Sequence, residues 1–392
     1  MTILILTHSY PDEEIKWRGI FIRDQALALS ARHRVIVVYF KVDYSRLRPF
    51  AGYSFRRRDT GNLTEYEVIT GRSFPVINQM KYLRDTYRFI RKEILSQSKV
   101  DILHSHLSYP AGFLGALIRQ KTHIPCIITE HSWINKYFRS FIHKWCVKYA
   151  LRHTDGIIAV SQALKDDIYA FIHAGRHSLN YVDNYIDIHV VPNVVDTARF
   201  TPVKRPKSQY LNIGLMGGMS NYRKGADILI RAVALLGDLN LMVHIGGAGT
   251  YLDTFKKLAA DLKVSDKFIF YGAIRPEEVN NFYSKLDLYV LASRDETFGV
   301  VVVEAMAAGL PVIATRCGGP EEIVTPATGI LVSKENPEEL AGAVRAISGK
   351  LAAYDRETIR KYASERYGPE KFLASVSEIY EVVVKKFSMT SV

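Results

Sequence analysis

The stretch DLYVLASRDETFGVVVVEAMAAG, residues 287–309, joins an apolar run to a polar turn and then to a second apolar run. The first run is short and rich in branched and aromatic residues, which predicts a buried strand, and the second predicts a helix that ends near Gly309. The start of that helix leaves free backbone N–H groups near Phe298 and Gly299. This strand, turn and helix therefore predict a parallel α/β sheet with an anion site at the turn.

Two glutamates, Glu296 and Glu304, interrupt the apolar pattern of this stretch. They are separated by a little over two helical turns, which places them about 80° apart around a helix. A carboxylate accepts hydrogen bonds from the vicinal hydroxyls of a sugar, whereas a valine could not. The alternative is that Glu296 caps the helix and Glu304 is a solvated helix residue. The pair alone leaves both interpretations open.

Apolar strand patterns alternate with helical patterns along the whole chain, in two series. The first series runs from ILILTHS to DGIIAVS and the second from LNIGLMGG to GILVS. The alternation predicts βαβ units and two Rossmann-like domains, whose ligands collect at the carboxyl ends of the strands. Two facing parallel sheets would form a central cleft. A chain of 392 residues also exceeds the roughly 250–300 residues that one core supports.

The expected division places a first domain at residues 1–200 and a second domain at 201–368. A polar segment with prolines, residues 190–209, is the best linker candidate between them. The last segment, residues 369–392, reads as an amphipathic helix. We therefore expect an α/β protein with two domains and a C-terminal helix.

Glycines and cations at two strand ends are candidates for phosphate binding. In the second domain, Gly218 follows a strand, and Arg223 and Lys224 precede a helix. A tight turn followed by cations can hold a diphosphate, although a surface loop is the alternative. In the first domain, Gly19 lies between the first strand and a helix, where it either lets the backbone approach a phosphate or is only a flexible loop residue.

Three histidines, His104, His106 and His131, follow predicted strand ends in the first domain. His131 lies where the cleft is expected, but a lone histidine is more often structural than catalytic. A metal site at His104 and His106 lacks an identifiable third ligand, which favours packing in the core or at its rim. The chain contains no Asp-x-Asp pair and three widely spaced cysteines without CxxC spacing, so neither a metal nor another cofactor is expected.

Basic residues concentrate in the first domain. Residues 41–152 contain 20 Lys and Arg against 8 Asp and Glu, and residues 136–152 place aromatic side chains at helical spacing beside five cations. Such a helix either lies on an anionic membrane or packs its apolar face on the core and leaves a solvated basic face. The N-terminus lacks the features of a signal peptide, which favours a cytoplasmic location, peripheral to the membrane if residues 41–152 bind lipid.

Taken together, these features resemble the retaining family 4 glycosyltransferases, the glycosyl transferases group 1 of the GT-B class. Residues 291–324, LASRDETFGVVVVEAMAAGLPVIATRCGGPEEIV, resemble the E-x7-E signature of the family and the strand that follows it. Residues 190–200, VVPNVVDTARF, resemble its interdomain segment. The resemblance implies a C-terminal helix, from about residue 369, that crosses back onto the first domain.

The resemblance also implies roles for individual residues. Glu296 would contact the transferred sugar, and Glu304 would hold the ribose hydroxyls. The backbone amides of Phe298, Gly299 and Val300 would meet the sugar and the diphosphate. The residues that would bind the donor are Gly19, Gly218, Arg223, Lys224, Glu296, Phe298, Gly299, Val300 and Glu304. The catalytic candidates are Glu296, His131 and Lys224.

Three further positions match the family pattern and one departs from it. Lys224 matches the phosphate-binding lysine, Gly19 the glycine loop that approaches the diphosphate from the other domain, and His131 a histidine near the donor sugar. The family commonly has Gly-Arg where this sequence has Met219 after its glycine. The second phosphate cation is therefore missing from its usual place, and Arg223 is its candidate replacement.

The resemblance implies an enzyme that moves a hexosyl or N-acetylhexosaminyl group from a nucleotide-sugar, by default a UDP-sugar. The acceptor would be a glycan or a lipid-linked molecule of cell-surface polysaccharide or glycolipid biosynthesis. The two alternatives are a sugar-nucleotide epimerase of similar fold and a non-catalytic basic scaffold. The basic region lacks a recognisable nucleic-acid motif, so no nucleic-acid partner is expected.

Overall fold

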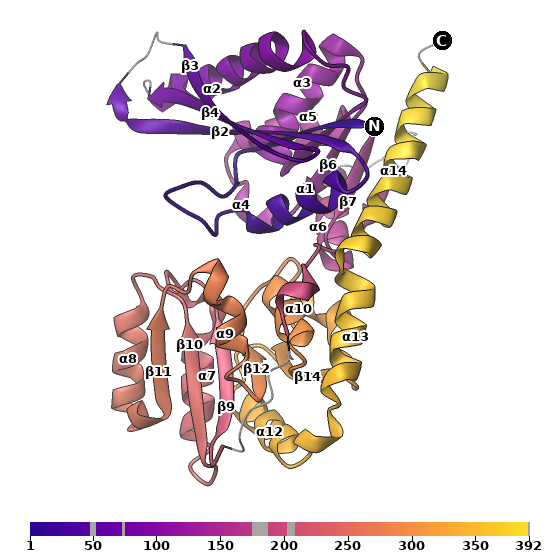
Figure 1. Ribbon diagram of the computed structural model, residues 1–392. Coiled ribbons are helices and arrows are strands. Elements are labelled where there is room, and N and C mark those ends of the chain that lie inside the picture. The colour runs from indigo at the N-terminus through magenta and orange to yellow at the C-terminus, as the bar shows by residue number, and fades with distance from the viewer. Residues whose placement is uncertain (48–51, 73–74, 175–186, 202–207, 391–392) are drawn as a thin grey trace. The chain divides into compact units, whose positions relative to one another are not determined.

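The computed structural model describes residues 1–47, 52–72, 75–174, 187–201 and 208–390, and these form two compact units. Unit 1 comprises Met1–Val194 and Phe372–Val392, and unit 2 comprises Val195–Lys371. The division after Val194 falls within the predicted linker, and the two divisions lie a few residues from the expected boundaries at 200 and 368. Each unit contains its own sheet with helices packed on it (Figure 1).

Unit 1 is built on an eight-stranded sheet in the order β3-β4-β2-β1-β5-β6-β7-β8. Its strands are β1 (Thr2–Thr7), β2 (Arg34–Leu47), β3 (Tyr53–Thr60), β4 (Leu63–Arg72), β5 (Ile102–His106), β6 (Cys126–Glu130), β7 (Gly156–Ala159) and β8 (Ile188–Val190). All neighbours pair in parallel except β3 and β4. The expectation of a purely parallel sheet is therefore wrong at this edge, where a hairpin turns at Gly61 and Asn62.

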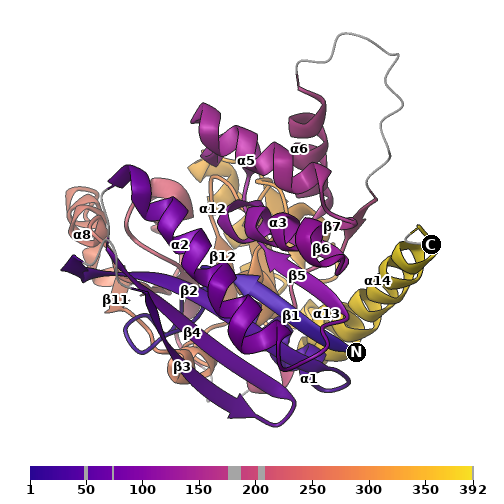
Figure 2. The ribbon, with the colours of Figure 1, turned by 90° about the horizontal axis from the view of Figure 1, so that it is seen from above.

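Helices cover both faces of the unit 1 sheet. They are α1 (Ile20–Ser30), α2 (Pro75–Phe89), α3 (Phe113–Thr122), α4 (Ile134–Tyr137), α5 (Phe141–Arg152), α6 (Gln162–His173) and α14 (Pro369–Thr390), with π-helical turns at Ile90–Leu95 and Ser108–Gly112. Along β1, Ile3 and Ile5 pack in a core with α1 and α14. Leu4 and Leu6 pack in a second core with α2 and α3, which lie over the strands in Figure 2. This two-sided burial explains why β1 is a continuous apolar run.

Unit 2 has a six-stranded, wholly parallel sheet in the order β11-β10-β9-β12-β13-β14. Its strands are β9 (Leu211–Met216), β10 (Leu241–Gly246), β11 (Phe268–Gly272), β12 (Leu288–Leu291), β13 (Val312–Thr315) and β14 (Gly329–Val332). Its helices are α7 (Ala226–Ala234), α8 (Leu252–Asp261), α9 (Val279–Tyr283), α10 (Val300–Ala307), α11 (Pro320–Ile323), α12 (Pro337–Ser348) and α13 (Arg356–Tyr367). The prediction of two Rossmann-like units is confirmed.

Each sheet has one point at which the strand order reverses. In unit 2 it lies between β9 and β12, because the chain builds β10 and β11 on one side of β9 and β12 to β14 on the other. In unit 1 it lies between β1 and β5. Loops diverge at such a reversal and leave a crevice at the carboxyl ends of the strands. A ligand site is therefore expected in the segments that follow β9 and β12 in unit 2 and β1 and β5 in unit 1.

Among the described residues, no helix combines the length and the apolar character that crossing a bilayer would require.

Candidate functional site

A buried ion pair lies at the reversal point of unit 2. Lys224 ends a short 3-10 helix, Tyr222–Lys224, that follows β9, and Glu296 follows β12. The Lys224 Nζ atom lies 2.6 Å from Glu296 Oε1. The Ser293 hydroxyl donates a second hydrogen bond of 2.8 Å to the same oxygen. Two residues 72 positions apart are thus brought together because β9 and β12 are neighbours in the sheet.

The charges around Glu296 keep its carboxylate ionised. Burial by itself would raise the pKa of Glu296, but Lys224 and Arg223 outweigh that effect and hold the pKa below its ordinary value. The Arg223 guanidinium lies 3.6 Å from Glu296 Oε2. An ionised carboxylate cannot supply a proton, but it can accept hydrogen bonds from hydroxyl groups.

The backbone of Glu296 is fixed as firmly as its side chain. Its amide donates to the carbonyl of Cys317 at 3.0 Å, and its carbonyl accepts from the amide of Gly319 at 3.0 Å. The N-cap of α10 is Gly299, without a side-chain capping bond. The alternative that Glu296 caps this helix is therefore wrong.

The three residues at the start of α10 present backbone groups. Phe298 is buried, with its ring packed against Tyr367 at a centroid distance of 5.7 Å, so only its backbone is available to a ligand. Gly299 precedes the helix and Val300 is its first residue. Their amides belong to the first turn, where N–H groups have no carbonyl partner within the helix. The anion site predicted here has the required helix terminus.

Glu304 lies farther along α10 and has its own partner. Its Oε2 accepts a hydrogen bond of 2.9 Å from the Tyr283 hydroxyl, whose oxygen also lies 3.2 Å from the carbonyl oxygen of Val301. Burial, and then the charge of Glu304, raise the pKa of Tyr283 well above its usual value. Glu304 is half-buried, so the description of a simply solvated residue is wrong. Tyr283 is a site neighbour that no sequence motif indicated.

The missing arginine at position 219 has a packing explanation. The side chain of Met219 is fully buried in the core of unit 2, where a guanidinium would be desolvated. Gly218 beside it is exposed and open. Arg223 donates to the carbonyl of Asp295 at 3.5 Å, so its cation lies beside the Glu296 carboxylate. Arg223, Lys224 and Glu296 form one cluster.

In unit 1, Gly19 is required by the local backbone. It is the N-cap of α1 with φ of 59°, and a Cβ atom there would lie 2.2 Å from the carbonyl oxygen of Ser9. Any other residue would strain this turn. The alternative that Gly19 is only a flexible loop residue is therefore wrong.

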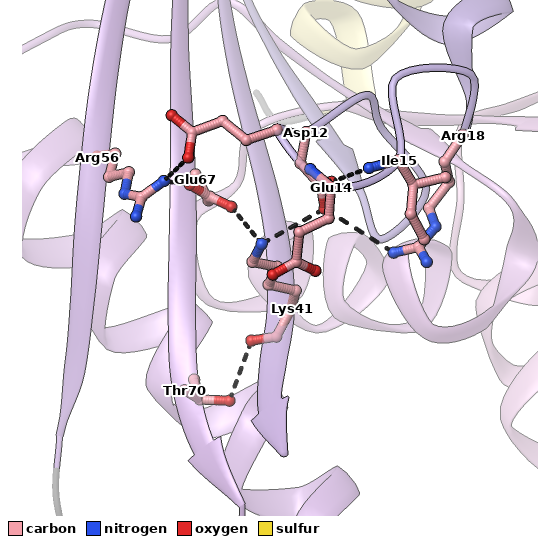
Figure 3. Close-up of polar contacts among 9 residues, drawn as sticks. Asp12, Glu14, Ile15, Arg18, Lys41, Arg56, Glu67 and Thr70 are labelled. Atoms are coloured by element: carbon pink, nitrogen blue, oxygen red, sulfur yellow. Dashed lines mark hydrogen bonds and ion pairs between the residues drawn. The ribbon is translucent and has the colours of Figure 1, made fainter. Parts of the chain in front are cut away.

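The loop that leads to Gly19 is tied to the sheet by a chain of charges (Figure 3). Asp12 accepts the amide of Ile15 at 2.7 Å and lies 3.4 Å from the ammonium group of Lys41 on β2. Lys41 in turn lies 2.8 Å from Glu67 on β4, and Arg56 on β3 extends the network at 3.6 Å from Glu67. The edge strands thus position the loop.

His131 is paired with His106, a buried histidine for which the sequence favoured a packing role. Its Nε2 lies 2.9 Å from Nδ1 of His106 at the end of β5, and the two rings stack at 17°. Burial lowers the pKa of His131 to about 3 and that of His106 well below its usual value. Phe21, two residues after Gly19, packs on the His131 ring at a centroid distance of 4.8 Å. Gly19, His106 and His131 therefore share one region of unit 1.

The backbone next to His131 is held by the buried carboxyl of Glu130. Its Oε1 accepts from the amides of His131 and Ser132 at 2.9 Å each, and its Oε2 accepts from the amide of Ser108 at 2.8 Å. Burial raises the pKa of Glu130 although these bonds oppose the rise. Within the described residues, no group of three or more His, Cys, Asp or Glu side chains could hold a metal ion.

Unit 1 is expected to lose stability when the pH falls from 6.5 to 5. The pKa of buried His104 and His131 is lowered to about 3, mainly by desolvation, so the unfolded state binds more protons in this window. Each histidine then contributes a loss of about 1.4 kcal/mol per pH unit below 6.5. Glu130 acts in the opposite sense, because its raised pKa favours protonation of the folded state.

Urea unfolding at pH 7.5 and 5.5, followed by tryptophan fluorescence, measures this loss. All three tryptophans, at positions 17, 133 and 145, belong to unit 1. His104→Gln removes one titrating ring, which bonds Tyr380 at 2.6 Å and Thr129 at 2.7 Å, and is expected to flatten the pH dependence. An unchanged unfolding midpoint between the two pH values would show that these rings titrate normally.

Two family models match the chain, with their border near the division between the units. The model described as Glycosyltransferase Family 4 matches residues 19–199. The model described as Glycosyl transferases group 1 matches residues 200–366. Together they span both of the regions in which the candidate site residues lie.

Relatives and solved structures agree with these models. An uncharacterized glycosyltransferase of Methanocaldococcus jannaschii is 29% identical over 335 residues, 82% of this chain and 88% of that protein. The alpha-monoglucosyldiacylglycerol synthase of Streptococcus pneumoniae is 27% identical over 285 residues, 66% of this chain and 61% of that protein. The structure of HepE from Anabaena in complex with UDP-glucose has a TM-score of 0.71 at 19% identity, covering 97% of this chain and all of that chain. The structural likeness shows the GT-B fold.

Proposed function

This chain belongs to glycosyltransferase family 4, and from that premise we propose that it transfers a sugar from a UDP-sugar, with retention and without a metal, to a glycan or lipid-linked acceptor. The reaction would serve cell-surface polysaccharide or glycolipid biosynthesis. The sugar would be a hexosyl or N-acetylhexosaminyl group, and the cytoplasmic location expected from the sequence is part of the proposal. The family assignment gives no support to the epimerase alternative.

The observation that carries the proposal is the Lys224–Glu296 pair at the reversal point of unit 2. A nucleotide-sugar has a diphosphate that needs cations and a sugar whose hydroxyls need acceptors. Lys224 and Arg223 supply the cations, and Glu296 supplies the acceptor within 4 Å of both. Because all three come from segments at neighbouring strand ends, one ligand could contact all of them.

Chemistry at such a site rests on charge and position. The bond between the anomeric carbon and the diphosphate oxygen breaks, the acceptor oxygen bonds to that carbon from the same face, and its proton passes to the leaving phosphate. Lys224 and Arg223 would stabilise the charge that develops on the diphosphate, and the amides at the start of α10 would add dipoles of the same sign. Glu296 would hold the sugar and would not act as a general base.

Two relatives support the identities of donor and acceptor. The HepE structure, which shares the fold, contains UDP-glucose, and this supports a UDP-sugar as donor. The Streptococcus pneumoniae relative is named for the synthesis of a glucosyldiacylglycerol, and this supports a lipid acceptor over a soluble one. Glu304 would then bind the ribose of the uridine, with its carboxylate oriented by Tyr283.

Calorimetric titration with UDP, GDP and ADP in the presence of EDTA tests the donor site. We expect UDP to bind without metal, and Glu304→Ala to weaken it by roughly tenfold or more because one charged hydrogen bond is worth about 1.5–3 kcal/mol. Glu365→Ala is the matched control, since Glu365 is an exposed glutamate on α13 in the same unit. Binding of none of the three nucleotides would refute the donor site and favour the scaffold alternative.

A further inference from the structure

The outer side of α5 in unit 1 exposes large apolar residues. The exposed fraction is 83% for Phe141, 67% for Ile142 and 54% for Trp145. Tyr137 on the preceding α4 is 52% exposed. Such residues are ordinarily found singly on a protein surface, so four of them within nine positions form an unusual patch. We call these four residues the aromatic patch.

The residues of the aromatic patch do not belong to the face of α5 that packs on the core. The opposite side of α5 already supplies the core residues Cys146, Val147, Ala150 and Leu151, all buried. The predicted single helix over 136–152 is interrupted between Tyr137 and Phe141, so its aromatic residues do not all face one way. The alternative in which the apolar residues of this segment pack on the core is wrong for Phe141, Ile142 and Trp145.

The orientation of Trp145 is fixed by its neighbours. Its ring stacks on Tyr149 at a centroid distance of 5.6 Å and meets Phe113 of α3 edge-on at 6.0 Å. At 100° per residue, Phe141 and Trp145 lie about 40° apart on the helix surface, and Ile142 continues the apolar strip on the same flank. Because its neighbours already hold the Trp145 ring, this side chain loses less entropy on binding than a mobile one would.

Cations border the strip on the other flank. By the same geometry, Lys144 lies about 60° and Lys148 about 20° from Phe141 on the side away from Trp145, and Arg152 lies about 20° from Phe141 on the Trp145 side. Lys136 and Arg139 precede the helix. No Asp or Glu occurs from His131 to Thr154. An acidic residue from outside this segment, Asp167 of α6, accepts the amide of Ile134 at 2.7 Å.

We propose that α4 and α5 form a docking surface for an anionic lipid bilayer, with the aromatic patch inserted at the level of the headgroups. Charge complementarity selects this occupant. Protein interfaces are depleted of lysine, whereas the patch is bordered by Lys136, Lys144 and Lys148. An amphipathic helix with aromatic residues on one flank and cations on the other is the arrangement that lies in a membrane surface. The inference deepens the proposed function, since it rests on a lipid-linked acceptor.

Vesicle flotation of the full-length protein at low salt tests the proposal. We expect binding to vesicles that contain about one third phosphatidylglycerol and little binding to phosphatidylcholine alone. Phe141→Ser with Trp145→Ser, and separately Lys144→Glu with Lys148→Glu, should each lower the partition coefficient by more than about tenfold, because each lipid-facing cation alone contributes roughly 1 kcal/mol. Met389→Ser is the matched control, since Met389 is 73% exposed on α14 of the same unit.

The outcomes distinguish a membrane from a second copy of the chain as the occupant of the aromatic patch. Wild-type protein that does not float with anionic vesicles, or a Phe141/Trp145 variant that floats like the wild type, would overturn the proposal. A wild-type dimer that becomes monomeric in that variant without lipid would assign the patch to a second copy of the chain and would equally overturn it. UDP calorimetry on each variant verifies folding and the donor site independently, so failure of membrane docking is distinguishable from failure of the proposed function.

Discussion

Replacing Glu296 by glutamine is expected to lower the rate of sugar transfer by about 10²- to 10³-fold, the effect of removing one preorganised electrostatic contact at a reaction centre. The amide keeps the shape of the side chain but loses the charge that pairs with Lys224 at 2.6 Å. The measurement is release of UDP from UDP-glucose, or from UDP-galactose or UDP-N-acetylglucosamine if the wild type prefers one of these. Affinity for UDP itself should change much less than the rate.

The same substitution leaves a nearly buried ammonium group without its counter-ion. The side chain of Lys224 is only 12% exposed, so thermal unfolding should show a loss of stability of up to about 3–5 kcal/mol. The double variant Lys224→Met with Glu296→Gln removes both charges and should recover much of that stability without recovering the rate. A double variant with restored turnover would show that the pair is structural and that the catalytic assignment is wrong.

Replacing Gly225 by alanine is expected to destabilise unit 2 by more than about 4 kcal/mol. Losses of this size are rare for single substitutions, and strain at an unusual backbone conformation is one of their few causes. Gly225 has φ of 67°, and a Cβ atom would lie 1.8 Å from the carbonyl oxygen of Ala292. That carbonyl belongs to the residue after β12, so the clash would push apart the two segments that bring Lys224 to Glu296. Donor binding should be lost together with the fold of this unit.

Urea unfolding followed by circular dichroism and by tryptophan fluorescence measures the effect of this substitution. The fluorescence reports unit 1 alone, because the three tryptophans lie there, and it should be unchanged while the circular dichroism transition shifts. Gly237→Ala is the control, because no atom lies within 4 Å of its Cβ position, and its effect should stay within about 1 kcal/mol. Equal stability of the two variants would contradict the proposed clash.

Unit 2 was predictable from sequence because its local signals agree with its fold. The segment 287–309 forms the predicted strand, turn and helix, with Glu296 in the turn and Glu304 in the helix. The pattern does not indicate which side chain bonds to each glutamate. Lys224 and Tyr283 reach their carboxylates through strand order and helix packing, and these depend on contacts between residues far apart in the chain.

The edge hairpin of unit 1 was not recognised because its charges obscure the strand pattern. Arg56 to Arg58 occupy three successive positions of β3, which gives no apolar alternation. On β4, Glu65 and Glu67 are buried, although isolated glutamates are expected at the surface. Arg58 pairs with Glu65 and Lys41 with Glu67, so the burial depends on cross-strand ion pairs that a linear pattern does not reveal.

The divided composition of unit 1 has a consequence for how the protein is made. Its core includes Phe372, Val376 and Tyr380 of α14, and Tyr380 bonds His104 across 276 positions of the chain. Unit 2 is contiguous, from Val195 to Lys371. During synthesis from the N-terminus, every residue of unit 2 therefore leaves the ribosome before the last helix of unit 1 does. Until then, the part of this sheet face that α14 covers stays exposed, and that interval is when a nascent chain of this kind most needs protection from aggregation.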